Sequence, residues 1–119
     1  MIEAEQLKYK LNSFQEPLED LSGSLALEAK KERIDQLELN MEEPGFWDAP
    51  EESQKIMKEL KDLQEHLKVI HALYSEYDDI CTLIEMVDEE EDRSMVKEIE
   101  KDIAHFEEDF EKLLHTPTA

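Results

Sequence analysis

The chain has 119 residues, which suits one domain and is too short for two cores of ordinary size. Its 33 acidic residues against 13 basic ones give a formal net charge of −20, so broad contact with nucleic acid phosphate is excluded unless a local basic patch intervenes. Two glycines and four prolines leave little turn chemistry for many strands, and Glu, Leu and Lys are strong helix formers. Composition therefore predicts an all-α protein.

Apolar residues recur at alternating steps of three and four along four segments, which predicts helices at about 3–21, 27–43, 49–87 and 93–114. The first segment carries the stripe Leu7, Leu11, Phe14, Leu18 and Leu21. Pro17 lies inside that stripe and lacks a backbone N–H, so a kink or a restart is expected near Glu16. The second segment places these residues inward before Pro44 and Gly45 end it: Leu27, Ile34, Leu37 and Met41.

Asp48 is predicted to cap the third helix, because its carboxylate can accept the free amides of the first turn. The third helix has the longest stripe, which runs through Ile56, Leu60, Leu63, Leu67, Ile70, Tyr74, Tyr77, Cys81 and Ile84. After an acidic turn, the fourth helix repeats this alternation with Val96, Ile99, Ile103, Phe106, Phe110 and Leu113. A short link between two long helices makes them antiparallel neighbours.

These stripes predict an antiparallel three- to four-helix bundle built on a long, coiled-coil-like helical hairpin, within a domain of residues 1–114. Residues 115–119 lack periodicity and are interpreted as an exit or linker. Phe46 and Trp47 precede Asp48, and all three are interpreted as structural anchors that fix the loop. Both aromatic rings are expected to be buried, and a partner-binding role is the alternative for them.

No cofactor, metal site or catalytic residue is predicted. Asp102 and His105 form only half of the pairing used in di-iron bundles, and the acidic turn has Arg93 where a calcium loop needs glycine. Cys81 lies on an apolar stripe, where a thiol acts as a small apolar group with a raised pKa. A single cysteine forms no internal disulfide, and we expect a cytoplasmic location without membrane insertion.

Three ordered segments are more specific than the heptads: Gly23-Ser24-Leu25-Ala26-Leu27-Glu28-Ala29-Lys30-Lys31-Glu32-Arg33-Ile34, Glu43-Pro44-Gly45-Phe46-Trp47-Asp48-Ala49-Pro50-Glu51 and Gln54-Lys55. With these three segments the chain resembles the N-terminal helical domain of the bacterial peptide chain release factor 2 family. The members of that family are class I translation termination factors. Ala26 stands where that family usually has aspartate, so the cap of the second helix would pass to Ser24 or be weak.

The resemblance implies a factor that ends translation at UGA and UAA codons. The family's codon-reading Ser-Pro-Phe and hydrolysis-promoting Gly-Gly-Gln tripeptides do not occur here, so the decoding and hydrolysis domains are absent from this chain. The implied role is accessory: docking near the stalk base of the large ribosomal subunit, onto a stalk base protein, and regulation of factor release. A translational GTPase release factor is a possible further partner, and no direct contact with mRNA is expected.

Lys30, Lys31 and Arg33 form the densest positive spot and are the candidate partner-binding residues, with pairing to nearby acids as the alternative. Two further classes of function remain beside the termination factor. The chain could be a free-standing acidic helical adaptor or nucleic acid mimic that binds a basic protein. A carboxylate-rich enzyme is nearly discarded, because most carboxylates lie off the apolar stripes.

Overall fold

The computed structural model describes residues 1–24 and 26–115, and it is helical without strands over these ranges. The all-α prediction is confirmed. The expected linker at 115–119 lies outside the described residues beyond His115. In chain order the helices are α1 (Ile2–Asn12), α2 (Gln15–Ser24), α3 (Leu27–Met41), η1 (Phe46–Asp48), α4 (Pro50–Glu90), η2 (Arg93–Met95) and α5 (Val96–Leu114).

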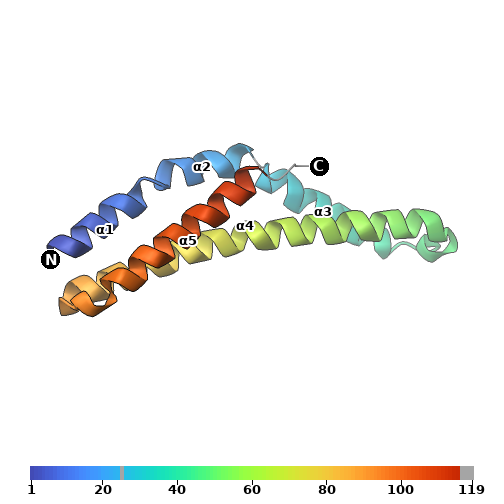
Figure 1. Ribbon diagram of the computed structural model, residues 1–119. Coiled ribbons are helices and arrows are strands. Elements are labelled where there is room, and N and C mark those ends of the chain that lie inside the picture. The colour runs from blue at the N-terminus through green and yellow to red at the C-terminus, as the bar shows by residue number, and fades with distance from the viewer. Residues whose placement is uncertain (25, 116–119) are drawn as a thin grey trace. The chain divides into compact units, whose positions relative to one another are not determined.

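The chain divides into two compact units, and α4 contributes residues to both. The first unit contains Met1–Ser24 together with residues 71–115, and the second contains residues 26–70. Within the first unit, the end of α4 and α5 form the predicted antiparallel hairpin, and α1 and α2 lie alongside it (Figure 1). No described helix combines the length and apolarity that crossing a membrane requires.

The first unit is held together by apolar residues from four helices. Its buried side chains are Ala4, Leu7, Leu11, Leu18, Leu21, Leu73, Ile80, Ile84, Val87, Ile99, Ile103, Phe106, Phe110 and Leu113. On α4 the buried positions include Leu73, Ile80 and Val87, which the single predicted stripe omitted, whereas Tyr74 and Tyr77 are only half-buried. The apolar face of α4 is wider than a two-helix seam because α4 packs against α1 and α2 as well as α5.

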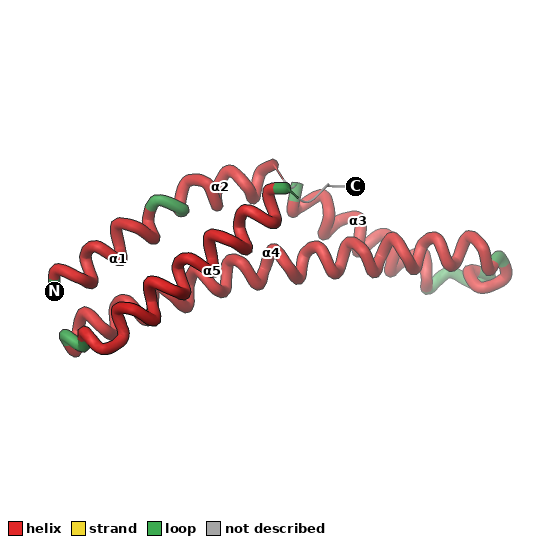
Figure 2. The backbone as a smooth tube through the Cα atoms, in the orientation of Figure 1, coloured by secondary structure: helices red, strands yellow, loops and turns green. Residues whose placement is uncertain are grey.

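Pro17 interrupts the first predicted helix as expected, and the break falls at Ser13 and Phe14 (Figure 2). Proline has no N–H to donate to the carbonyl of Ser13, so the helix stops at Asn12 and restarts at Gln15. Apolar packing nevertheless continues through the break. The Phe14 ring lies edge-on to Phe106 with 5.3 Å between ring centroids.

The acidic turn between α4 and α5 is a tight helix end. Glu91 adopts a left-handed conformation with φ of +50°, and the Asp92 amide donates to the carbonyl of Val87 at 3.1 Å. This is the pattern of a Schellman C-cap, in which Glu91 occupies the position that glycine usually takes. The Asp92 carboxylate then accepts from the Ser94 amide at 3.0 Å and caps η2. Helix α4 therefore extends to Glu90, three residues beyond the predicted end.

The second unit pairs α3 with the first half of α4. Leu37, Leu67 and Ile70 are its buried apolar residues, and three more of the predicted inward residues are half-buried: Leu27, Ile34 and Met41. Ala26 occupies the N-cap position of α3 in a left-handed conformation, and its side chain makes no capping hydrogen bond. The structure therefore agrees with the sequence, which has alanine where the family usually has a capping aspartate. The Ser24 side chain lies outside what the structure describes.

The predicted cap at Asp48 is wrong in position. Asp48 is the last residue of η1, and α4 begins two residues later at Pro50, so Ala49 precedes the helix. Pro50 takes the first helical position, where a missing N–H costs nothing. The turn that reverses the chain before η1 depends on Gly45, whose φ is +86°.

Candidate partner-binding surface

The three candidate cations on α3 are not an open positive patch. Arg33 binds Glu59 of α4 through two hydrogen bonds, of 2.7 Å from Nε and 2.9 Å from Nη2. Lys31 lies 3.4 Å from Glu28 on its own helix. Lys30 is half-buried, and its charge contributes to lowering the pKa of His66, after the larger effect of burial. Lys31 thus pairs with an acid on its own helix, whereas Arg33 pairs with an acid on α4 and not with a neighbour on α3.

The bidentate pair links α3 to α4 within the second unit. Hydrogen bonds from Arg33 hold the pKa of the Glu59 carboxyl below its usual range. Both side chains remain partly exposed, so solvent screens the pair and its contribution to stability is small. A guanidinium already engaged by a carboxylate has fewer donors to offer a phosphate. The geometry therefore favours a structural role for Arg33.

The loop between α3 and α4 is fixed by Ser53, a residue that the sequence analysis did not single out. The Ser53 side chain is 2% exposed and its hydroxyl lies 2.5 Å from the carbonyl oxygen of Phe46 and 3.0 Å from that of Ala49. The hydroxyl can donate to either oxygen, and both are close enough to share it. The anchoring of the loop thus comes from a buried serine on α4.

The expected burial of Trp47 is wrong. Its side chain is 58% exposed, whereas Phe46 is half-buried. The Phe46 and Trp47 rings meet edge to face, with 4.7 Å between centroids and 87° between planes. Two helices provide no third layer at their connecting loop, so one aromatic ring packs on the other and the outer ring remains in water.

Acidic side chains surround the exposed tryptophan in sequence. The exposed acids within this loop and the first turn of α4 are Glu42, Glu43, Asp48, Glu51 and Glu52. Lys55 lies 3.9 Å from Glu52, and both remain largely exposed. We call Trp47 and these five acids the loop surface. The exposed tryptophan makes this loop a candidate protein-binding patch, because aromatic residues are enriched at interfaces.

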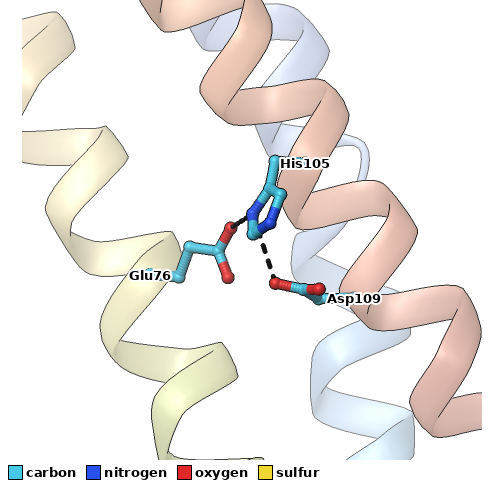
Figure 3. A group of neighbouring side chains, drawn as sticks. All are labelled: Glu76, His105 and Asp109. Atoms are coloured by element: carbon cyan, nitrogen blue, oxygen red, sulfur yellow. Dashed lines mark hydrogen bonds and ion pairs between the residues drawn. The ribbon is translucent and has the colours of Figure 1, made fainter.

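The first unit contains a separate cluster of one histidine and two carboxylates (Figure 3). His105 Nδ1 of α5 lies 3.0 Å from Glu76 Oε1 of α4 and 3.3 Å from Asp109 Oδ2 on its own helix. The hydrogen bond with Glu76 and the charge of Asp109 raise the pKa of His105, and burial raises that of Glu76. A protonated imidazole held between two carboxylates is thereby stabilised.

The same cluster supplies one ligand atom from each side chain, all within 4.8 Å of one another, which is the grouping a metal ion would need. The sequence predicts no metal site and places Asp102 three residues before His105. In the structure His105 contacts Asp109, four residues later on α5, and not Asp102. Since each of its contacts is already an ion pair, the cluster serves to link α4 with α5 in this unit.

Comparison with known proteins decides the family. A family model described as the PCRF domain matches residues 30–118. The chain belongs to the PCRF domain family. The matched region contains α3 from Lys30 onward, the loop surface, α4 and α5, whereas α1 and α2 lie outside it.

Curated relatives extend the similarity to nearly the whole chain. Peptide chain release factor 2 of Aliivibrio fischeri is 34% identical over 113 residues, which cover 95% of this chain and 31% of the relative. The protein of that name from Lactiplantibacillus plantarum is 33% identical over 111 residues, covering 93% and 29%. The chain therefore spans about three tenths of the length of these relatives. The resemblance inferred from the sequence is confirmed.

Cys81 of the PCRF domain is half-buried on α4, and burial raises the pKa of its thiol, as the sequence predicted. A thiol with a raised pKa carries little thiolate, so it is a weak nucleophile.

Two features of the structure were not predicted from the sequence. The Ser53 position showed only as a small polar residue one turn into a helix, and Glu76 showed no signal at all, because its partners are 29 and 33 residues away.

Proposed function

We propose that this chain is the N-terminal accessory domain of a peptide chain release factor that terminates translation at UGA and UAA codons. Membership in the PCRF domain family and the similarity to relatives named peptide chain release factor 2 are the observations that support this role. The chain contains neither Ser-Pro-Phe nor Gly-Gly-Gln, so codon reading and hydrolysis belong to other parts of such a factor.

The domain docks on the large ribosomal subunit near the base of its stalk and regulates binding and release of the factor. Its net charge of −20 supports a protein partner with a basic surface, because rRNA phosphate repels a polyanion. The pairing of Arg33 with Glu59 and of Lys31 with Glu28 supports the same choice. A translational GTPase release factor is a second partner consistent with a regulatory role, and the domain acts in the cytoplasm.

A chimeric release factor tests this proposal. The corresponding N-terminal segment of the Aliivibrio fischeri factor is replaced by this chain, and peptidyl-tRNA hydrolysis is measured on ribosomes programmed with UGA. The chimera is expected to keep the hydrolysis rate at saturating factor. A deletion of the segment is expected to hydrolyse at a detectable rate but with altered affinity or release. Complete loss of hydrolysis in the deletion would contradict an accessory role.

A further inference from the structure

We propose that Trp47 is the central contact through which this domain binds the ribosome, and that its partner is a basic protein surface with an apolar slot. The inference rests on the proposed function and assigns the docking to the loop surface. Lys30, Lys31 and Arg33 are then outside the contact.

The loop backbone beside Trp47 is held by a buried hydrogen bond, and the Trp47 ring rests on Phe46. The buried Ser53 hydroxyl fixes the Phe46 carbonyl at 2.5 Å, and the Phe46 ring supports one side of the Trp47 ring. Gly45 makes the turn at positive φ, and a Cβ there would lie 3.2 Å from Asp48 Oδ2. A pre-organised side chain loses little conformational entropy on binding, so more of its contact energy becomes affinity.

The exposure of Trp47 is unusual for its residue type. It is the single tryptophan of the chain, and its side chain keeps 58% of its surface in water. Tryptophan is the residue type most enriched among the few that dominate binding energy. Placing the exposed part of this ring in an apolar slot removes it from water at little cost, because its neighbour Phe46 already supports it.

The rim of the loop surface selects the chemistry of the partner. Five exposed acids lie in the eleven-residue segment 42–52, which contains no lysine or arginine, and Lys55, three residues later, lies 3.9 Å from Glu52. This rim attracts lysine and arginine and repels phosphate, so it favours a ribosomal protein over rRNA. Electrostatic attraction of this kind speeds association and weakens as salt is added. The dissociation rate is set by the Trp47 ring, which becomes buried in the complex.

Four forms of the chain test the proposal: wild type, Trp47→Ala, Trp47→Phe and the control Leu39→Ala. Leu39 is 62% exposed on α3 of the same unit, so its truncation removes a comparable exposed apolar side chain outside the loop surface. Binding to isolated large ribosomal subunits is measured by co-sedimentation, with protein-free rRNA as the competing probe. Circular dichroism verifies that each variant is as helical and as heat-stable as wild type.

Trp47→Ala is expected to weaken binding roughly 30-fold or more, which corresponds to the loss of a binding hot spot. Trp47→Phe is expected to recover part of that affinity, and Leu39→Ala is expected to bind within about twofold of wild type. Raising the salt concentration should weaken binding of wild type and of Trp47→Ala alike, since the acidic rim is unchanged in both.

The other outcomes separate the inference from the function on which it rests. If wild type binds and Trp47→Ala binds equally well, the assignment to Trp47 is overturned while ribosome docking stands. Equal binding of wild type to protein-free rRNA overturns the protein partner. Self-association that is lost in Trp47→Ala shows that Trp47 binds a second copy, which also overturns the assignment. If wild type does not bind large subunits at all, both this inference and the proposed docking fail.

Discussion

Replacing Phe106 with alanine tests the packing of the first unit most severely. The Phe106 side chain is fully buried and its ring contacts the rings of Phe14, Tyr77 and Phe110, at centroid distances of 5.3, 5.7 and 6.2 Å. Truncation removes roughly 150 Å² of buried apolar surface, or about 4 kcal/mol at about 25 cal/mol per Å². Lost ring-to-ring contacts place the expected destabilisation in the upper half of the range of about 3 to 5 kcal/mol for such changes.

Unfolding in urea, followed by circular dichroism at 222 nm, measures this free energy directly. A loss of about 4 kcal/mol is a large share of the roughly 5 to 15 kcal/mol that holds a domain of this size folded. Tyr9→Ala is the matched control, because Tyr9 is an exposed aromatic residue of α1 in the same unit and its loss should cost under about 0.5 kcal/mol. A cost below about 1 kcal/mol for Phe106→Ala would refute the packing of Phe14, Tyr77 of α4 and Phe110 of α5 around this ring.

Three further changes test local contacts. Ser53→Ala should lower the free energy of unfolding by about 1 to 2 kcal/mol and loosen the loop, seen as lower fluorescence anisotropy of Trp47; unchanged anisotropy would show that Ser53 does not fix it. Tyr74→Phe should cost about 0.5 to 1.5 kcal/mol in urea unfolding, since its hydroxyl donates to the Leu18 carbonyl at 2.8 Å, and no cost would exclude that bond. The pKa of His105 is raised above its usual 6.5 in the folded state, so the stability that its charge contributes is complete below pH 6.5 and is lost as the pH rises through the folded-state pKa. His105→Gln should therefore flatten the dependence of the free energy of unfolding on pH in this range. An unchanged pH profile would show that His105 is not stabilised by Glu76 and Asp109.

Much of the fold follows from the spacing of apolar residues. Five stripe residues before Ser22 and six after Arg93 predicted helix faces that the structure buries or half-buries, and Pro17 predicted the break between α1 and α2. The additional buried positions Leu73, Ile80 and Val87 could not be assigned in advance. They depend on how many helices pack against α4, which periodicity along a single helix does not reveal.

The candidate surface was harder to predict than the fold. Hydrophobicity alone predicted that Trp47 is buried, but burial requires a neighbouring layer, and Trp47 packs edge to face on Phe46 and remains 58% exposed. Lys30, Lys31 and Arg33 are close together in the sequence of α3, yet the partner of Arg33 is 26 residues away on α4, so the sequence could not show that Arg33 is engaged. A pair between residues this far apart in the sequence forms only when α3 packs against α4, and the spacing of residues along one helix does not reveal it.

The central claim is that a chain with net charge −20 folds by itself through its apolar stripes. Thermal unfolding of the isolated 119-residue chain, followed by far-ultraviolet circular dichroism, tests it most directly. The account predicts a strongly helical spectrum at neutral pH that is lost on heating. A spectrum of disordered chain at neutral pH, with helix gained only at acidic pH or high salt, would contradict it, because charge repulsion would then outweigh the apolar packing.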